Sequence, residues 1–415
     1  MKYIDLRICA LFLAGAVAAG LVGCGTSRPT VDVESDLAFC HDRVELALSD
    51  LVSGDSVDYS MIPRNIAPGD SLWTLRPAVA EEWCSGFWPG MLWLDYETTR
   101  DEEVERQARR YTEALGQILD KPVFDHDLGF LMFCSYGNAY RLTRDTMYRD
   151  VILRTADSLA VLFNPRVGTM LSWPRNVEMF GGHNTIMDNM INLETLFWAA
   201  DNGGDQSLRD MAIKHAETTM ANHFRPDGTC YHVAVYDPDT GEFKRGCTHQ
   251  GLSDESTWSR GQAWAVYGYT VVYRATRDPR FLEFACKVTD AYLDRLPEDH
   301  IPYWDFDDPR IPDAPRDASA ACVVASALTE LIGYVDHDHA SRYASELEAM
   351  LLSLSTDAYR PGDRCRSALL HSTGHHPAGS EIDYSIVYAD YYYMEALNRF
   401  AKIKDLSTFA SLRVG

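Results

Sequence analysis

Apolar residues recur at positions i, i+3, i+4 and i+7 in a series of segments that begins near residue 34 and runs almost to the end of the chain. This spacing is typical of helices that bury one face. It predicts helices over 34–53, 87–99, 101–118, 127–142, 145–163, 185–201, 205–222, 257–276, 279–293, 315–333, 338–356 and 382–403. Strand-like segments are few. The best of them, Cys230 to Tyr236 and the stretch around Phe243, predict a hairpin inside a loop.

The connections between the predicted helices alternate in length. Short connections fall at 99–100, 143–144, 202–204, 276–277 and 335–339, and long ones fall at 54–86, 119–126, 164–184, 223–256, 294–314 and 357–381. Helical hairpins whose long loops all lie at one end close into a ring. The pattern therefore predicts an all-α fold, an (α/α)6 toroid of six helical hairpins. We expect the end that carries the long loops to carry the function.

Every second predicted helix differs in kind from its neighbours. Segments 261–273 and 318–332 are apolar nearly all round and rich in small residues, whereas helices 101–118 and 205–222 carry a charged face. Because a helix that is apolar all round is buried, the even-numbered helices are expected to form an inner ring. No change of composition divides the ring, so residues 34–415 are predicted to be a single catalytic domain.

Composition and charge narrow the possible partners. The chain has 415 residues, of which 46% are hydrophobic and 24% charged, and this is typical of a globular protein. Its formal net charge is -23, which excludes a nucleic-acid partner and disfavours anionic membrane surfaces. An acidic small substrate requires local Arg, His or backbone donors that overcome this charge. Nothing in the pattern predicts an oligomeric state.

The first residues resemble a bacterial lipoprotein signal. Lys2 and Arg7 precede an apolar run over 8–22, which ends in the small-residue sequence Leu-Val-Gly before Cys24. We expect residues 1–24 to be a signal peptide with the lipobox ending at Cys24, the lipidation site, and residues 25–33 to be a tether. The mature protein is then exported and anchored by lipid to a bacterial membrane, facing the periplasm.

The remaining cysteines do not form a metal-binding pattern. They are scattered, with no CxxC pair and no zinc-like spacing, and several lie in apolar helical segments. We expect buried thiols rather than disulfides or ligands. They are Cys40, Cys84, Cys134, Cys230, Cys247, Cys286, Cys322 and Cys365. No metal and no cofactor is predicted.

Acidic residues stand near the starts of several predicted helices. Asp188 lies among Met and Ile residues in the stretch 184–193, and Asp127 and Asp317 begin or closely follow the starts of two other helices. Each could simply cap its helix, where a carboxylate is favourable against the helix dipole. A buried carboxylate is costly unless it is paired, neutralised or used. The apolar neighbours of Asp188 are expected to raise its pKa.

Basic and aromatic side chains occur at equivalent helix starts. Arg260 near a helix N-terminus opposes the dipole, so it requires an anionic partner, which could be Asp127, Asp188 or a ligand. Trp88 and Trp264 could be core aromatics or walls of a site. If the ring closes, all of these residues converge at the long-loop end. Two carboxylates with aromatic walls suit glycosidic-bond chemistry, and Arg260, His126, His183 and His232 would supply positive charge for an acidic sugar.

Three segments at helix starts carry a specific resemblance. They are His126–Phe130, Asp188–Leu193 and Trp258–Trp264, and they occur in this order. Together they resemble the unsaturated glucuronyl hydrolases, glycoside hydrolase family 88. The resemblance extends from the Gly-Phe-Trp sequence at 86–88 to the aromatic final helix at 388–397. One such segment alone would be weak evidence, whereas three in order are strong.

The resemblance implies roles for individual residues. Asp188 corresponds to the catalytic acid/base of the family and Asp127 to its second essential aspartate. The residues implied for substrate binding are Trp88, His126, Trp173, His232, Gln250, Arg260 and Trp264. The loop 357–381 cannot be matched to the family, so its Ser and His residues receive no role.

The resemblance also implies a reaction. Family members act on oligosaccharides left by polysaccharide lyases, whose non-reducing end is a C4–C5 unsaturated uronic acid. A proton is added at C4 of this vinyl ether, water adds at C5, and the resulting hemiketal opens and expels the next sugar. Asp188 would donate the proton and then help to activate the water, while Asp127 would hold the ring hydroxyls and tune Asp188. The implied substrate is a glycosaminoglycan fragment, and no metal takes part.

Two other functions fit part of the pattern. One is unsaturated rhamnogalacturonyl hydrolase activity in pectin breakdown, glycoside hydrolase family 105, which shares the toroid and the chemistry. The Arg-Gly-Gln-Ala-Trp sequence at 260–264 favours the glucuronyl group. The other is a non-catalytic sugar-binding lipoprotein, against which the presence of both Asp127 and Asp188 argues.

Overall fold

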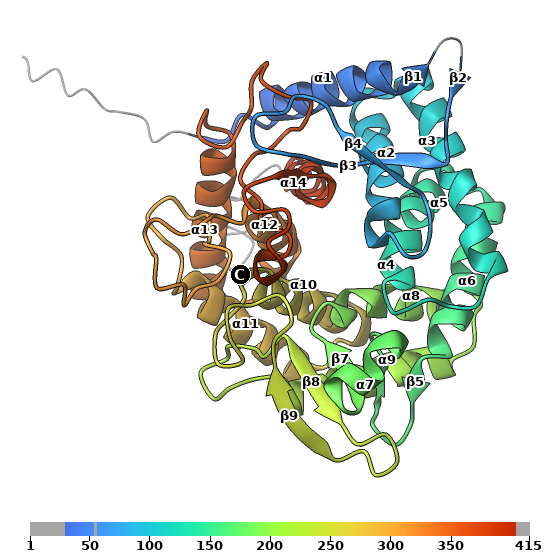
Figure 1. The fold of residues 1–415 in the computed structure, drawn as a ribbon, viewed down its shortest axis with the longest axis vertical. Coiled ribbons are helices and arrows are strands. Elements are labelled where there is room, and N and C mark those ends of the chain that lie inside the picture. Colours follow the sequence, from blue (N-terminus) through green and yellow to red (C-terminus); the bar gives the residue numbers. More distant parts are fainter. Residues whose placement is uncertain (1–29, 54–55, 404–415) are drawn as a thin grey trace, which may run out of the picture. The chain divides into compact units, whose positions relative to one another are not determined.

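The computed structural model describes residues 30–53 and 56–403, and the chain from Val31 on forms one compact unit. The predicted signal peptide, its Cys24 and residues 25–29 of the tether lie outside the described residues. Each of the twelve predicted helices is present (Figure 1). They are α1 (Val33–Leu51), α2 (Phe87–Thr99), α3 (Glu102–Ala114), α4 (Leu128–Met132) with its continuation α5 (Asn138–Thr143), α6 (Thr146–Ala160), α8 (Asn189–Asp201), α9 (Ser207–Asn222), α10 (Ser259–Thr276), α11 (Pro279–Leu293), α12 (Ala318–Leu331), α13 (His337–Leu354) and α14 (Val387–Phe400).

The helices form two concentric layers within this unit, which confirms the predicted toroid. Helix α2 contacts α5 and the π-helical turn that follows α4, and α4, α8, α10, α12 and α14 contact one another in sequence. Because α14 returns to contact α2, the inner ring closes (Figure 1). The outer helices α3, α6, α9, α11 and α13 each pack against inner helices, and α1 packs against both α2 and α14. The even-numbered predicted helices are therefore the inner ones, as their all-round apolar character indicated.

Burial explains why the inner helices carry so few charges. Every residue of α12 from Ala318 to Thr329 is buried, and α10 is buried from Ser259 to Val272. The outer helix α3, by contrast, buries only Val104, Ala108, Tyr111 and Thr112 and exposes its charged face. Among the described residues, no helix is long and apolar enough to cross a membrane.

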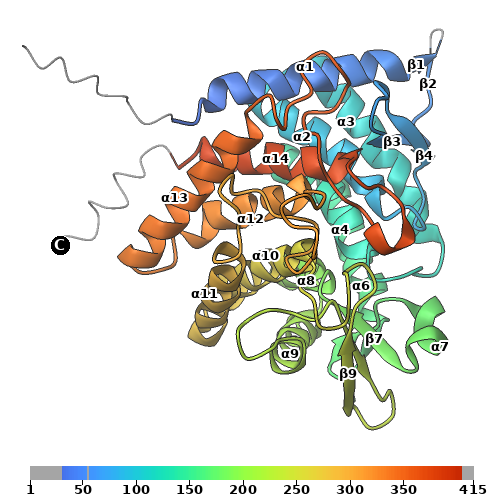
Figure 2. The ribbon, with the colours of Figure 1, turned by 60° about the vertical axis from the view of Figure 1, so that its left-hand side comes forward.

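The long loops lie at one end of the ring and are joined to one another. They contain short strands, namely β1 (Val52–Ser53), β2 (Ser56–Val57), β3 (Met61–Ile66), β4 (Thr74–Pro77), β5 (Phe163–Asn164), β6 (Thr169–Met170), β7 (His183–Ile186), β8 (Val233–Tyr236), β9 (Phe243–Cys247) and β10 (Ser385–Ile386). β10 pairs with β3, which connects the last long loop to the first, and β7 pairs with β8, which connects the third to the fourth. Figure 2 shows β3, β4, β7 and β9 on the same side of the helices.

The predicted elements differ from the observed ones in the loops and at several helix ends. The hairpin of β8 and β9 is confirmed, but the other strands were not predicted, and the last helix begins at Val387 rather than at residue 382. The helix predicted to begin at residue 185 begins at Asn189, because residues 183–186 pair with β8 instead. A π-helical turn over Phe133–Gly137 separates α4 from α5. The eight cysteines of the described chain are free thiols, and only Cys286 among them is partly exposed.

Candidate functional site

Asp188 is held at the start of α8 by the pairing of β7 with β8. Ile186 pairs with Val233, and the backbone N–H of Met187 donates to the carbonyl of His232 at 2.9 Å. Residues 182–187 and 189–193 are all buried, whereas the Asp188 side chain retains 16% exposure. This side chain accepts no capping hydrogen bond from its own helix. Asp188 is therefore not a helix cap, and its carboxylate faces the open space at the long-loop end.

His232 directs an N–H at Asp188. Its Nδ1 accepts from the backbone N–H groups of His249 and Gln250, both at 3.2 Å. Because Nδ1 acts as an acceptor, the hydrogen of the neutral ring lies on Nε2. Nε2 is 3.5 Å from Asp188 Oδ2, and neither atom has a hydrogen-bond partner among the described residues. The two atoms therefore keep unused hydrogen-bonding capacity that a substrate group beside them can take up.

Asp127 forms a second pair of the same kind. It immediately precedes α4, does not cap that helix, and retains 14% exposure. The Nε2 atom of the fully buried His126 lies 3.2 Å from Asp127 Oδ1. The backbone N–H of His126 donates to the carbonyl of Ser172 at 3.2 Å, which ties this helix start to the loop before β7. Two carboxylates, each faced by a buried imidazole, therefore stand at neighbouring inner-helix starts.

The two carboxylates differ in their expected protonation. Burial raises the pKa of Asp127 well above its ordinary value, and the negative charges of Asp125 and Asp188 raise it further. Burial also raises the pKa of Asp188, but the contact with His232 and the nearby His126 and Arg260 outweigh burial and lower it. The prediction that apolar neighbours keep the pKa of Asp188 raised is therefore wrong for the unliganded site. Burial and the neighbouring charges therefore favour the protonated form of Asp127 over that of Asp188.

Arg260 has a different partner from those predicted. Its guanidinium is 1% exposed, donates to Asp317 Oδ2 at 2.5 Å, and donates to the carbonyls of Thr373 and Gly374 at 2.5 and 2.6 Å. It also lies over the rings of Trp258 and Tyr388. Because all of these contacts are internal, Arg260 anchors the last long loop rather than presenting a free cation. The positive charge of Arg260 still lowers the pKa of Asp188.

Two of the predicted tryptophans belong to the core. Trp88 is fully buried and packs edge-to-face against Tyr111 of the outer helix α3, with ring centroids 6.1 Å apart. Trp264 is 1% exposed and packs in the same manner against Tyr392 of α14. Both side chains pack among helices in the unliganded site, and their roles in substrate contact stay predictions.

Trp173 lies at the centre of the site. Its ring stacks on Phe180 at 5.8 Å and contacts the rings of His126, His232 and His249 edge-on at 6.2, 6.1 and 5.0 Å. One aromatic side chain therefore spans both histidine–carboxylate pairs. The structure brings together Asp127, Asp188, His126, His232 and Trp173 from the predicted set.

The loops contribute the predicted Gln250 together with residues that were not predicted. Gln250 Nε2 donates to the carbonyl of Gly374 at 3.2 Å, which joins the fourth long loop to the sixth. His249 Nε2 lies 3.4 Å from His375 Nε2, and burial together with His232 and His375 lowers the pKa of His249 to about 4. Trp258 packs against His232 with ring centroids 4.6 Å apart. Trp258 belongs to the third resemblance segment, so it could have been found, whereas His249 and His375 had no local signal.

His183 does not provide the predicted positive charge. Burial lowers its pKa to about 4, and its Nε2 lies 3.0 Å from Thr169 Oγ1 within the interior. Burial likewise lowers the pKa of His126. Burial therefore disfavours the charged forms of His126 and His183, and the charge of Arg260 is paired internally.

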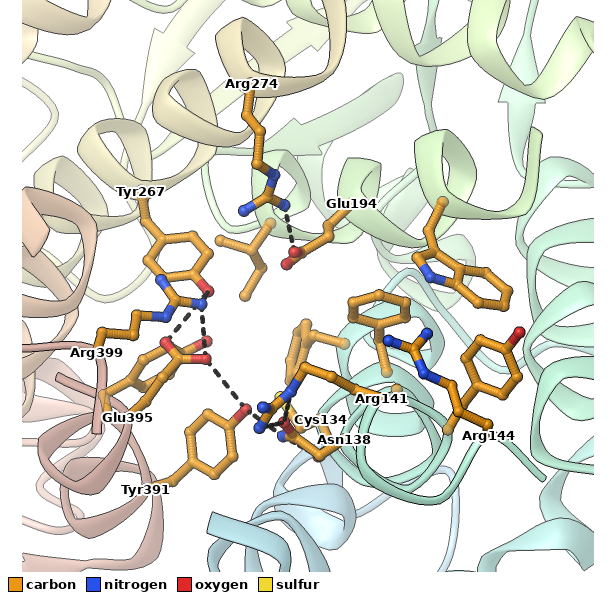
Figure 3. A pocket seen from close by; sticks show the side chains of 17 residues that line it. Cys134, Asn138, Arg141, Arg144, Glu194, Tyr267, Arg274, Tyr391, Glu395 and Arg399 are labelled. Carbon is orange, nitrogen blue, oxygen red and sulfur yellow. Dashed lines mark hydrogen bonds and ion pairs between the residues drawn. The ribbon is translucent and has the colours of Figure 1, made fainter. Parts of the chain in front are cut away.

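A separate cavity of about 320 Å³ occupies the ring centre farther along the inner helices (Figure 3). Its lining includes Phe130 and Ile191, each one helical turn after a site carboxylate. Five of its six charged side chains form ion pairs, and the sixth, Arg144, lies over the ring of Tyr140. Glu395 bonds to Tyr267 and Arg399, and Arg274 bonds to Glu194 (Figure 3). Because the carboxylates of the site do not line this cavity, it is not the predicted substrate site.

Known proteins are similar to this chain in sequence and in fold. A family model described as Glycosyl Hydrolase Family 88 matches residues 63–359. An unsaturated glucuronyl hydrolase from Formosa agariphila is 42% identical over 325 residues, which are 77% of this chain and 80% of that protein. An unsaturated chondroitin disaccharide hydrolase from Streptococcus pneumoniae is 34% identical over 331 residues, which are 77% of this chain and 82% of that protein.

A solved structure agrees over most of both chains. The crystal structure of an unsaturated glucuronyl hydrolase specific for heparin superposes with a TM-score of 0.82 at 40% sequence identity. The match covers 90% of this chain and 97% of the other. The resemblance and the fold class inferred from the sequence are both confirmed.

Proposed function

The chain belongs to glycoside hydrolase family 88, and on that premise we propose that it releases the C4–C5 unsaturated uronic acid from the non-reducing end of lyase-generated glycosaminoglycan oligosaccharides. The observation that carries the proposal is the pair of carboxylates, Asp127 and Asp188, each faced by the Nε2 atom of a buried histidine. Such a pair can hold one proton and one negative charge, which acid–base chemistry at a vinyl ether requires.

Asp188 is the proton donor in this proposal. It protonates C4, and the positive charge that develops at C5 and the ring oxygen is removed when water attacks C5 and gives its proton to the Asp188 carboxylate. The C5 hemiketal then opens to a ketone, and the hemiacetal left at C1 releases the next sugar. Asp127 holds ring hydroxyls and shares the proton of the pair.

The lowered pKa of Asp188 in the unliganded site is compatible with this role. The substrate carries its own carboxylate, and a negative charge brought close to a carboxyl group raises the pKa of that group. Binding of the uronate therefore favours transfer of the proton from the surroundings of Asp127 to Asp188. Protonation of the donor is thus coupled to the arrival of an acidic substrate.

The test is loss of the ultraviolet absorbance of the C4–C5 double bond in an unsaturated disaccharide. Asp188→Asn removes the proton donor and should lower kcat by about 10²–10⁴-fold, with circular dichroism and Tm close to those of the wild type. Consumption of the disaccharide by Asp188→Asn at the wild-type rate would overturn the assignment. Wild-type protein with no activity on any unsaturated uronyl disaccharide would overturn the function itself.

The substrate preference follows from a panel measured in the same way. Unsaturated disaccharides from chondroitin, hyaluronan and heparin, each with and without sulfate, should be consumed faster than the unsaturated product of a rhamnogalacturonan lyase. Faster consumption of the pectin-derived product would favour the rhamnogalacturonyl activity instead.

We propose further that the protein is exported and attached to the bacterial membrane by lipid on Cys24, and faces the periplasm. The support is the lipobox-like sequence at 21–24 behind a basic start and an apolar run. Cys24→Ala removes the acceptor of the lipid, and the protein should then move from the membrane fraction to the soluble fraction. Retention of Cys24→Ala in the membrane fraction would contradict this proposal.

A further inference from the structure

Asn192 connects the two catalytic helices at the level of the site. It is fully buried in α8, one turn after Asp188. Its Oδ1 accepts a hydrogen bond from the backbone N–H of Phe130 in α4 at 2.7 Å, and its Nδ2 lies 3.1 Å from His126 Nδ1. A backbone N–H can only donate, so the amide oxygen of Asn192 must face Phe130 and its NH₂ group must face His126.

This arrangement determines the tautomer of His126. An NH₂ group can only donate, so His126 Nδ1 must be the acceptor. The ring hydrogen is then on Nε2, which lies 3.2 Å from Asp127 Oδ1. With the hydrogen on Nε2, the neutral imidazole turns an N–H toward the Asp127 carboxyl and favours its ionised form, against the burial that raises its pKa, although the two atoms form no hydrogen bond in the unliganded site. With the other tautomer, a lone pair on Nε2 would face the carboxylate and oppose its ionisation.

The surrounding backbone leaves room for this amide. A Cβ atom on Gly129 would lie 2.3 Å from Asn192 Oδ1, so only glycine at this position admits the carboxamide. The N–H of Phe130 belongs to the first turn of α4, where backbone donors have no partner within the helix. Asn192 therefore also satisfies a donor of the helix that begins at Asp127.

We propose that Asn192 is a positioning residue, which fixes His126 as the Nε2–H tautomer and thereby sets the ionisation of Asp127. The consequence for turnover rests on the proposed function, because it assumes that Asp127 and Asp188 share a proton during the reaction. The backbone N–H groups of His249 and Gln250 do the same for His232 on the Asp188 side. Asn192 is the one side chain through which this control can be removed by substitution.

The informative variant is Asn192→Asp. A carboxylate at this position still accepts from the N–H of Phe130, but it presents an oxygen to His126 Nδ1 instead of a donor. His126 must then carry a hydrogen on Nδ1. We expect the ¹⁵N NMR signals of His126, assigned by comparison with His126→Gln, to report the Nε2–H tautomer in the wild type and protonated Nδ1 in Asn192→Asp.

The kinetic consequence should appear in kcat and its pH dependence. Loss of a residue that orients a catalytic group typically lowers activity by about 10–100-fold. We expect a fall of this size in kcat for Asn192→Asp, a smaller change in KM, and a displaced pH profile. The titratable and charged groups around His126 are Asp125, Asp127, Asp188, Arg175 and His232, and all of them are unchanged in this variant.

Thr195→Val is the matched control. Thr195 lies one turn after Asn192 in α8 and donates to the carbonyl of Gly129 at 3.1 Å, so it occupies the same helix contact without touching His126. It should leave the tautomer and the pH profile as in the wild type. A displaced profile in Thr195→Val would assign the effect to helix packing and overturn the proposal.

Two further outcomes decide the proposal. A wild-type His126 with its hydrogen on Nδ1, or an Asn192→Asp variant with the wild-type tautomer and profile, would overturn it. If Asn192→Asp does not fold, Gly129→Ala keeps Asn192 and displaces its amide, and the same loss of the Nε2–H tautomer is expected. The NMR result needs no substrate, so it stands even if the protein does not turn over unsaturated disaccharides.

Discussion

Asp127 and Asp188 have identical side chains, but their surroundings shift the two pKa values in opposite directions. Both lie at inner-helix starts, both are faced by a buried imidazole, and both retain a small exposed fraction. Asp188 has three positively polarised or charged neighbours that lower its pKa, whereas Asp127 has three negative neighbours that raise its pKa. The difference lies in the neighbours and not in burial, because burial acts on both in the same direction.

The raised pKa of Asp127 has a consequence for stability. A group whose pKa is higher in the folded than in the unfolded state contributes stability below its unfolded pKa and loses it as the pH rises through the folded value. The Asp127→Asn variant has no titrating group at this position, so it does not lose stability in this way as the pH rises. The Tm of Asp127→Asn should therefore rise relative to that of the wild type as the pH increases from about 4 to about 9. A constant or shrinking difference in thermal unfolding would contradict the raised pKa.

The sequence was informative about the residues that carry chemistry and less informative about the aromatic ones. Asp127, Asp188 and His126 were identified because charged and polar residues are conspicuous at the start of a buried helix, and His232 was identified through the family resemblance. Trp88, by contrast, is buried against the outer helix α3. An inner helix is apolar all round, so its periodicity does not distinguish the face toward the site from the face toward the outer helices.

At the scale of elements, the inner helices cross at very short distances. A Cβ atom on Gly268 of α10 would lie 2.4 Å from the Cβ of Met190 in α8, with the Met190 backbone at 3.2 Å. Because Met190 follows Asp188 by two residues, this contact fixes the helix that presents the proton donor. Close helix packing and the position of the site carboxylate are thus set by the same residues.

Gly268→Ala tests this contact. The added methyl group must displace the backbone of α8, at a cost of about 1–3 kcal/mol, and the helix preference of Ala offsets about 1 kcal/mol of it. The expected result is a lower Tm together with a lower kcat. Gly333→Ala is the control, because Gly333 is exposed and its added Cβ would meet only the carbonyl of Glu330 at 3.4 Å. An unchanged Tm and kcat for Gly268→Ala would contradict the claim that this contact fixes the position of α8.

Helices were predictable from the sequence to a degree that strands were not. The 3.6-residue period is local, so each helix could be recognised from its own residues. The strands β7 and β10 have two to four residues each and exist because their partners lie in other loops. No local pattern reports such a partner, and for the same reason the contact of His249 with His375 could not be foreseen.

At the scale of the whole molecule, the net charge opposes the proposed substrate. The formal net charge is -23, and the substrate carries at least one carboxylate. The histidines of the site do not offset this repulsion when they are neutral, and Arg260 is already paired. Long-range repulsion slows association and is weakened by salt.

We therefore expect kcat/KM to increase a few-fold as the ionic strength rises from about 10 mM to about 150 mM, while kcat remains nearly constant. Initial rates across substrate concentrations at each salt concentration give both parameters. A decrease of kcat/KM with salt would show instead that the local field of the site attracts the substrate despite the net charge.

The layer below the carboxylates limits how a polysaccharide can be degraded. Phe130 and Ile191 are each 4% exposed, follow the site carboxylates by one helical turn and line the cavity of Figure 3. We infer from this position that a sugar chain cannot thread through the toroid. It can enter only tip first and must back out after every cut. Breakdown by such an enzyme is distributive rather than processive, so its rate depends on the number of chain ends that lyases supply and not on the length of the chains.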